Sequence, residues 1–558
     1  MLNRPPCGIY YVPDAYGHTT QGIIGRQSAG REFLKAYASS NPPQGFRCVA
    51  DTTENFATFL DLIAQFGADP AEAFHIGSND IDAISRIGTL YWPDPVLGRA
   101  AFARRSLRND AYSLCGVTHS LSESGAIAGI QDMLVAPLWP WDALICTSQA
   151  ARRAVENILA EWSVYLSERM GVAPAIPVQL PVIPLGVDAD RFRTTDAKVN
   201  NGRALRQQLG IPDSAVLGLY FGRFNFLTKS HPTPMFMAFA QAAANAPDVD
   251  LRLMMTGQFA NPLVEAEFLN LAQKYCGNVP IAWVDGRNQD ASEASWAAAD
   301  FFVSLPDNVQ ETFGMTALEA MAASLPCVVA DWSGLKESVV DGDTGFLVPT
   351  RMPSPDASEM VLARATFGVE SFDDSIAALS QVVAVDIADC ASRIAALAAN
   401  RDLRRDLGRR ARLRIERDYD WKKILPRYEA LWDELATIRA GSSGVGLRSP
   451  APAQVGQTDP FVAFGHFATA RLTAGSKVTC LDAAAQTRLA GISADPSHTV
   501  LLPLLVTNAD MIGILGFLQE TGTASVAQIE DKFNYLRREK IALSLLWMAK
   551  FGVVRITG

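Results

Sequence analysis

The chain has 558 residues, a formal net charge of −10 and a sequence pI near 5.3. This length allows three or four domains with large apolar cores. The acidic balance argues against a protein that binds nucleic acid over its whole surface, and the eight cysteines, without a CxxC pair or other zinc-type spacing, favour buried free thiols in a reducing, cytoplasmic compartment.

Strand-like apolar runs alternate with helical patterns through most of the chain. We expect strands at residues 8–12, 143–147, 216–221, 251–256, 301–304 and 327–330. Such alternation is typical of doubly wound parallel sheets, which bind ligands beyond the carboxyl ends of their strands. The predicted fold class is therefore α/β.

A turn at residues 182–190, with Pro184 and Gly186, interrupts the alternation. We place there the boundary between a first Rossmann-like domain, residues 1–190, and a second, residues 191–438. The second domain is expected to end with a basic amphipathic helix over 402–417 and a further helix from Asp420 to about residue 438. Residues 351–386 look like an insertion with one or two helices.

The end of the chain has a different composition. Residues 439–459 are rich in Gly, Ser and Pro, which predicts a flexible linker. Residues 460–558 then form an accessory domain, with helices expected at 511–521, 526–533 and 537–548 and a strand at 553–556, an order compatible with a winged helix. The longest apolar stretch, 500–518, contains Pro503, Asn508 and Asp510, so we expect no membrane span.

Two acids, Glu311 and Glu319, flank a small turn and an apolar helix that ends before Pro326. If this helix began right after Glu311, both acids would lie near one face of it. Residues 312–315 would then expose backbone N–H groups at the helix N-terminus, where the helix dipole favours an anion such as a diphosphate.

Two cations, Arg223 and Lys229, follow the strand expected at 216–221. Taken alone they are better interpreted as a solvated basic turn. Combined with Glu311 and Glu319 about ninety residues later, they suit the binding of one pair of phosphates at the edge of a sheet.

At these residues the chain resembles the retaining glycosyltransferases of family 4, which have the GT-B fold. The matching features are GRxxxxxK at 222–229, the two acids Glu311 and Glu319 with seven residues between them, the PxGVDxxxF turn at 184–192, and the last helices with Asp420-Trp421. The resemblance covers roughly residues 1–438 and is strongest from residue 182 onward. It implies two Rossmann-like domains, with the first on the acceptor side and the second on the side of a nucleotide-sugar donor.

The resemblance also implies roles for individual residues. Arg223 and Lys229 would neutralise the diphosphate leaving group, Glu311 would bind hydroxyls of the donor sugar, and Glu319 would accept the ribose hydroxyls. The other donor-binding residues implied are in the loop and helix start of the second domain and in a glycine loop of the first: Phe313, Gly314, Met315, Thr316, Gly22 and Gly25.

His119 corresponds to a family histidine near the donor sugar and joins Arg223, Lys229 and Glu311 as a catalytic candidate. A lone histidine is more often a structural hydrogen-bonding group, and that alternative stays open. Residues 283–287 are where the family places the nucleotide base, and an ordinary surface turn fits them about as well.

The expected function is the metal-independent, retaining transfer of a hexose from a UDP- or GDP-sugar to a hydroxyl of a glycan, lipid-linked or protein acceptor, with no cofactor beyond that donor. Peripheral contact with the inner membrane face is compatible with this reaction. The alternative is a GT-B core in a regulatory or binding protein whose last domain engages nucleic acid or a protein. That domain has nine Lys/Arg against seven Asp/Glu after residue 459, too small an excess of positive charge for a dedicated nucleic-acid-binding domain. We prefer oligomerisation or acceptor docking as its role.

Overall fold

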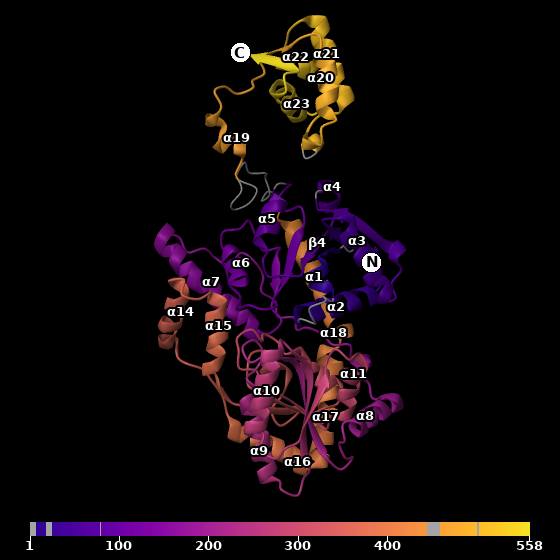
Figure 1. Ribbon diagram of the computed structural model, residues 1–558, viewed down its shortest axis with the longest axis vertical. Helices are drawn as coiled ribbons and strands as arrows, with labels where there is room; N and C mark the ends of the chain where they lie inside the picture. The colour runs from indigo at the N-terminus through magenta and orange to yellow at the C-terminus, as the bar shows by residue number, and fades with distance from the viewer. Residues whose placement is uncertain (1–6, 18–24, 79, 106, 443–457, 499–500) are drawn as a thin grey trace. The chain divides into compact units, whose positions relative to one another are not determined.

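The computed structural model describes residues 7–17, 25–78, 80–105, 107–442, 458–498 and 501–558. It divides the chain into two compact units, residues 1–455 and 456–558. The first unit contains two parallel sheets with helices packed around them (Figure 1). Among the described residues, no helix is long and apolar enough to cross a membrane.

The first domain is built on a six-stranded parallel sheet with the order β3-β2-β1-β4-β5-β6. Its strands are β1 Cys7–Tyr10, β2 Phe46–Ala50, β3 Ala73–Gly77, β4 Thr89–Trp92, β5 Ser113–Val117 and β6 Ala143–Ile145. The helices are α1 Pro13–Tyr16, α2 Gly25–Ser39, α3 Thr53–Gln65, α4 Ile81–Ile84, α5 Gly98–Arg105, α6 Ser124–Asp132 and α7 Gln149–Met170.

The second domain repeats this topology, because its sheet has the order β12-β11-β10-β7-β8-β9 and is also parallel. Its strands are β7 Val216–Phe224, β8 Leu251–Phe259, β9 Ile281–Asp285, β10 Phe301–Ser304, β11 Cys327–Ala330 and β12 Gly345–Val348. Its helices are α8 Asp196–Gln208, α9 Pro232–Asn245, α10 Pro262–Tyr275, α11 Gln289–Ala298, α12 Met315–Ala322, α13 Leu335–Ser338, α16 Ile387–Ala399 and α17 Arg401–Arg414. The predicted class of two doubly wound GT-B domains is confirmed.

In both sheets the strand order reverses next to the first strand, between β1 and β4 and between β7 and β10. Open sheets of this kind bind ligands in the crevice at that reversal, outside the carboxyl ends of the strands. The topology therefore points to the loops after β7 and β10 as a site. These loops carry Lys229 and Glu311, and Arg223 is the last residue but one of β7.

The insertion between β12 and α16 contains two short helices, as expected. It consists of β13 Thr350–Arg351, α14 Ser358–Thr366, α15 Phe372–Leu379 and β14 Ala384–Val385, and its two strands pair antiparallel. The carboxylate of Asp373 in α15 accepts a hydrogen bond of 2.9 Å from the backbone N–H of Ser124, the first residue of α6. The insertion thus reaches from the second domain to the first.

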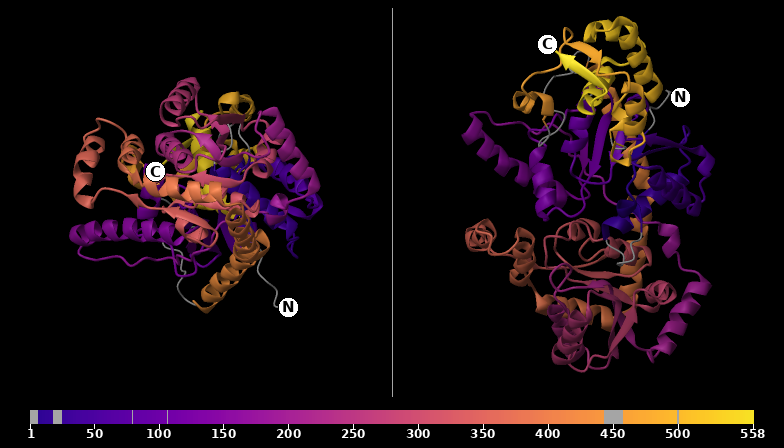
Figure 2. Two further views of the ribbon diagram at one scale, coloured as in Figure 1. Left: turned by 90° about the horizontal axis from the view of Figure 1, so that it is seen from below. Right: turned by 45° about the horizontal axis from the view of Figure 1, so that its top comes forward.

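The last helix of this unit, α18 Trp421–Gly441, does not belong where the sequence analysis placed it. Its apolar face packs into the core of the first sheet together with Phe33, Tyr91 and Ile145, and Figures 1 and 2 show it in orange among the purple elements of that domain. The buried side chains of α18 in this core are Trp421, Ile424, Leu425, Tyr428, Leu431, Trp432 and Leu435. Residues 421–438 are therefore part of the first domain, because their apolar partners lie there.

The boundary near residue 190 also shifts. Leu185, Val187 and Ala189 pack in the core of the second domain, whereas Ile183 packs in that of the first. The turn at 184–192 is thus already part of the second domain.

The second unit has its own apolar core around Val478, Ile514 and Leu545 and a three-stranded antiparallel sheet with the order β16-β15-β17. Its elements are α19 Pro460–Ala463, β15 Lys477–Cys480, α20 Ala485–Ser493, α21 Asn508–Thr521, β16 Ala524–Ser525, α22 Val526–Lys532, α23 Arg538–Lys550 and β17 Val554–Thr557. The order from α21 to β17 is compatible with a winged helix, which stays a prediction. The central strand β15 was missed because its sequence, KVTC, contains no apolar run and only Val478 in it is fully buried.

Candidate donor site at the carboxyl edge of the second sheet

The basic turn after β7 is fixed by hydrogen bonds to its own loop and to the loop after β10. The side-chain amide of Asn308 donates to the carbonyl of Lys229, and the carbonyl of Asn308 accepts a bond of 2.8 Å from the indole N–H of Trp332. Arg223 is exposed near the end of β7, and its carbonyl accepts a bond of 3.2 Å from the hydroxyl of Tyr220. Both predicted cations thus lie at an edge of the sheet whose backbone is held by hydrogen bonds.

Lys229 and Glu311 meet at this edge. The Lys229 Nζ lies 3.4 Å from Oε2 of Glu311, and both side chains are partly buried. Two separate sequence motifs are therefore joined in space. Glu311 itself precedes α12, which begins only at Met315, so the condition that would place Glu311 and Glu319 on one helical face is not met.

Gly314 explains this late start of α12. It is the N-cap residue with φ of 90° and ψ of 57°, a left-handed conformation that glycine adopts without strain. A Cβ at this position would lie 2.4 Å from Cδ2 of Leu335. Because the first N–H groups of an α-helix have no partner within it, those of Met315 and Thr316 present a positive helix end at the site.

Phe313, the residue before this glycine, is buried in the core of the second domain. A Cβ on Gly334 would lie 2.7 Å from the Cα of Phe313. The backbone of residues 312–314 is thus packed against the start of α13, which fixes the loop that holds the predicted donor-binding residues Phe313 and Gly314.

Glu319 lies in the middle of α12 in an acidic environment. Burial raises its pKa to about 7, the nearby Arg191 lowers it, and Glu32 and Glu293 raise it further. Arg191 pairs with Glu293 and lies 3.9 Å from Glu32 of α2 in the first domain. The single guanidinium of Arg191 thus faces the carboxylates of Glu32, Glu293 and Glu319. A bound ligand with hydroxyl groups would donate hydrogen bonds to the oxygens of Glu319.

Sequence reasoning missed Arg191, although it lies in the 184–192 turn. Asp188 fixes the position of Arg191 in this turn, because its carboxylate accepts a hydrogen bond of 3.2 Å from the backbone N–H of Arg191. The same carboxylate forms an ion pair of 2.7 Å with Lys35 in α2. The only feature of the sequence that could have indicated a role for Arg191 was its position between Asp188 and Phe192.

His119 follows β5 of the first domain and faces the loop that carries Glu311. The hydroxyl of Thr312 donates a bond of 2.9 Å to its backbone carbonyl, and the hydroxyl of Ser148, which follows β6, donates one of 3.0 Å to the carbonyl of Thr312. The carboxyl edges of the two sheets therefore face each other across Thr312.

The imidazole of His119 is neutral near pH 7. Burial lowers its pKa to about 4, Arg26 lowers it further, and a hydrogen bond with the backbone of Pro93 raises it. A neutral imidazole both donates and accepts one hydrogen bond. The ring thus suits a hydroxyl ligand better than an anion.

Of the two predicted contacts in the glycine loop, Gly22 lies outside the described residues. Gly25 is the first residue of α2, and a Cβ built on it would meet no atom within 4 Å. Arg26, the next residue, lies 3.6 Å from Asp94 after β4. Gly25 therefore lies near the point between β1 and β4 where the strand order of the first sheet reverses.

The expected base segment, 283–287, ends β9 at the same edge. Arg287 pairs with Asp285 at 2.7 Å, and both are exposed. The backbone N–H of Gly286 donates a bond of 2.7 Å to the carbonyl of Gly257, and a Cβ on Gly257 would lie 1.8 Å from the carbonyl oxygen of Gly222. The three neighbouring strands β7, β8 and β9 thus end in closely packed glycines.

Comparison with known proteins agrees with this geometry. Residues 202–365 match the family model of glycosyl transferases group 1. This segment contains β7, β10 and α12 with Arg223, Lys229, Glu311 and Glu319, so the match lies in the second domain. The resemblance to the family 4 glycosyltransferases is confirmed.

Curated relatives match over part of their length. The D-inositol 3-phosphate glycosyltransferase of Streptomyces scabiei is 30% identical over 250 residues, which are 41% of this chain and 54% of that protein. The enzyme of the same name from Geodermatophilus obscurus is 32% identical over 196 residues, 34% of this chain and 42% of that protein. The chain thus spans about half the length of the curated relatives it matches.

Solved structures align more widely at low identity. Anabaena Alr3699/HepE in complex with UDP aligns with a TM-score of 0.49 and 14% identity over 77% of this chain and 100% of that chain. Sucrose-phosphate synthase from Thermosynechococcus elongatus aligns with a TM-score of 0.48 and 18% identity over 78% of this chain and 100% of that chain.

Proposed function

We propose that this protein is a glycosyltransferase that moves a hexose from a nucleoside diphosphate sugar to an acceptor hydroxyl. The observation that carries the proposal is the meeting of Lys229 and Glu311 at 3.4 Å, beside Arg223 and the N-terminus of α12. This arrangement places a cation, a carboxylate and a positive helix end at the switch point of one sheet, where a diphosphate with a sugar attached would find partners for both its parts.

The chemistry follows from the charges. When the bond between sugar and phosphate breaks, the diphosphate gains negative charge while the sugar becomes oxocarbenium-like. Arg223, Lys229 and the N–H groups of Met315 and Thr316 would stabilise that leaving group more strongly in the transition state than in the ground state. These groups supply the charge compensation that a metal provides in other transferases, so we propose a metal-independent reaction with no cofactor beyond the donor.

The remaining residues position the donor. Glu319 as a carboxylate would accept both ribose hydroxyls, and Glu311 would accept hydroxyls of the hexose. The neutral imidazole of His119 would hydrogen-bond the sugar from the side of the first domain. We further propose attack by the acceptor hydroxyl on the face from which the diphosphate leaves, with retention of configuration. Closure of the two domains over the donor would limit hydrolysis.

The acceptor would bind on the side of the first domain. The name of the curated relatives supplies one candidate, D-inositol 3-phosphate, which we include among glycan, lipid-linked and protein acceptors. The regulatory alternative is not favoured by any observation on the second unit, whose role in acceptor docking or self-association stays a prediction.

A panel of UDP- and GDP-sugars tested for thermal stabilisation examines the proposal. A ligand that binds only the folded state raises the free energy of unfolding, by about 2.7 kcal/mol when its concentration is a hundred times Kd. The melting temperature rises as a result. We expect stabilisation of the wild type by at least one donor, its loss in Lys229→Ala and Glu319→Ala, and its retention in Lys274→Ala, an exposed lysine on α10. Stabilisation that persists in both site variants would refute the assignment.

A further inference from the structure

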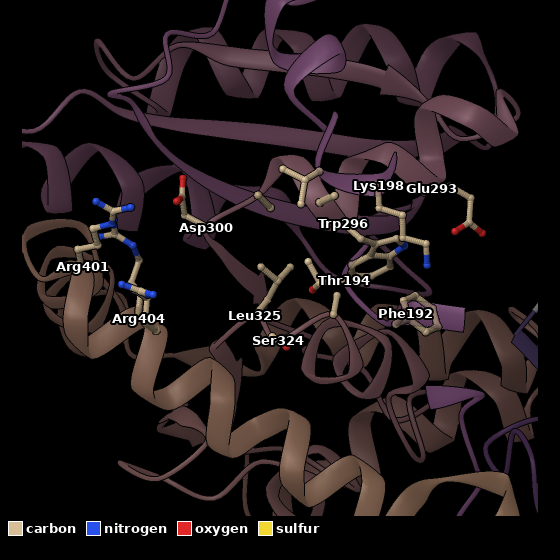
Figure 3. A pocket seen from close by; sticks show the side chains of 15 residues that line it. Phe192, Thr194, Lys198, Glu293, Trp296, Asp300, Ser324, Leu325, Arg401 and Arg404 are labelled. Atoms are coloured by element: carbon tan, nitrogen blue, oxygen red, sulfur yellow. The ribbon is translucent and has the colours of Figure 1, made fainter. Parts of the chain in front are cut away.

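A cavity of about 330 Å³ lies in the second domain, apart from the donor edge. It is open to solvent and bordered by α8, α11, α17 and residues 323–325, which follow α12; Figure 3 shows its lining side chains. The donor edge lies at the N-terminus of α12 and this cavity at its C-terminal end, so the eight residues of that helix separate the two by about 12 Å. A volume of this size is that of a small-ligand pocket.

The walls of the cavity carry more positive than negative charge. Its lining contains Lys198, Arg401, Arg404 and Arg405 together with two acids, Asp300 and Glu293. Both acids are neutralised by arginines that are not in the lining. Asp300 pairs with Arg206 at 2.6 Å and accepts a bond of 2.9 Å from the N–H of Leu217, and Glu293 pairs with Arg191.

The three arginines of α17 that line the cavity have no carboxylate of their own, although Arg404 already donates to the backbone carbonyls of Leu397 and Ala398. Within the described ranges, no acidic oxygen lies within 4.0 Å of Arg401, Arg404 or Arg405, in contrast to Arg409, Arg410, Arg412 and Arg414 further along the helix, which all have acidic partners. Burial lowers the pKa of Arg404, and the neighbouring Arg401 and Arg206 lower it further against the opposing effect of Asp300. An anion would relieve this repulsion.

The other end of the cavity is aromatic. Trp296 and Phe192 line it with ring centroids 5.8 Å apart in an edge-on arrangement. Figure 3 shows Arg401 and Arg404 at one end of the pocket and Trp296 and Phe192 at the other. Both rings are largely buried in the core of the second domain, and Trp296 stacks on Phe221 with ring centroids 4.5 Å apart, so only a small part of each ring faces the pocket.

We propose that this cavity is a second ligand site, distinct from the donor site, that binds a small organic phosphate with its phosphate at Arg401, Arg404 and Arg405 and its ring toward Trp296. Guanidinium groups bind phosphate oxygens through paired N–H donors, and the exposed part of Trp296 offers the ring of the ligand an apolar contact. The site adjoins both α12, which carries Glu319, and α11, which carries Glu293.

The test uses the full chain and glucose 6-phosphate as the probe, followed by calorimetric titration at constant ionic strength. Inorganic phosphate and glucose are the matched probes for the two halves of the ligand. We expect saturable binding of glucose 6-phosphate, tighter than that of either half, and at least about tenfold weaker binding by the double variant Arg401→Ala/Arg405→Ala.

Two controls separate this site from other sources of binding. Arg409→Ala, on the same helix and paired with Asp406 at 2.8 Å, should bind the probe like the wild type. Lys229→Ala, which impairs the donor site, should do so as well, and this keeps a failure here distinct from a failure of the proposed function. The absence of saturable binding, or equal loss in Arg409→Ala and in the double variant, would overturn the proposal, as would loss of binding in Lys229→Ala.

Discussion

The hydroxyl of Thr312, the residue after Glu311, donates a hydrogen bond of 2.9 Å to the backbone carbonyl of His119. This bond joins the loop of the second domain that carries Glu311 to the residues that follow β5 in the first domain. Two catalytic candidates that lie 192 positions apart in the chain, Glu311 and His119, are thereby held on facing edges.

Replacing Thr312 by valine tests this bridge. Valine keeps the branched shape and removes the donor, so the carbonyl of His119 loses one bond worth about 0.5–1.5 kcal/mol. We expect turnover to fall by about two- to thirteenfold, the factor that corresponds to this energy, with little change in donor affinity. Steady-state kinetics measure both quantities. Thr312→Ser retains the hydroxyl and should behave like the wild type, and equal losses in the two variants would argue against the bridge.

The raised pKa of Glu319 predicts a pH dependence. Its folded-state pKa is about 7 against 4.5 for the ordinary group, because burial favours the neutral acid. The folded protein therefore holds an extra proton between these values, so its stability contribution is complete below pH 4.5 and is lost as the pH rises through about 7. Donor binding, which needs the carboxylate, should instead strengthen over the same range.

Melting temperatures of the wild type and Glu319→Gln, measured from pH 5 to 8.5, test this predicted dependence of stability on pH. The difference between the two proteins should change in favour of the variant as the pH rises through about 7. Taking the difference removes the contribution of His119, whose lowered pKa acts in the opposite direction. A difference that is constant with pH would contradict the assignment.

Gly314→Ala should destabilise the second domain. Its φ of 90° is strained for alanine, and the added Cβ would lie 2.4 Å from Cδ2 of Leu335. We expect a loss of about 1–3 kcal/mol in unfolding free energy, together with weaker donor binding because the start of α12 must move. Urea unfolding measures the first effect. Gly125→Ala, in α6 with no atom within 4 Å of the new Cβ, is the matched control and should cost far less.

The place of α18 can be tested through its buried face. Leu435→Ala removes a fully buried side chain from the core of the first domain and should cost about 2–5 kcal/mol. Leu413→Ala, at a position that is 52% exposed on α17, should cost little. If the two substitutions shift the urea midpoint equally, α18 does not pack as described.

Much of this fold could be predicted because its signals are local. The strands at 301–304 and 327–330 were predicted with the bounds that β10 and β11 have, since both are short, apolar and fully or largely buried. By contrast β5, with the sequence SLCGV, mixes serine and glycine into a buried strand and does not stand out. The sequence predicted a helix from Asp420 to about residue 438, but which of two cores the apolar face of α18 enters is a tertiary property.

The site was predictable to a similar degree. The types and spacing of Arg223, Lys229, Glu311 and Glu319 indicated a diphosphate site, and the topology brings the first three to adjacent strands. That Glu311 precedes the helix depends on the backbone of Gly314, and that Arg191 serves Glu319 depends on packing between the turn and α12. Only weak signals of these two arrangements exist in the sequence: Gly314 itself, and the place of Arg191 in the 184–192 turn.

The most direct test of the central claim is a crystal structure of the protein with a bound nucleoside diphosphate. We predict phosphate oxygens within about 2.7–3.2 Å of Lys229 Nζ and of the backbone N–H groups of Met315 and Thr316, with the ribose hydroxyls on Glu319. A nucleotide bound elsewhere, or one whose phosphates do not touch the N-terminus of α12, would contradict the account.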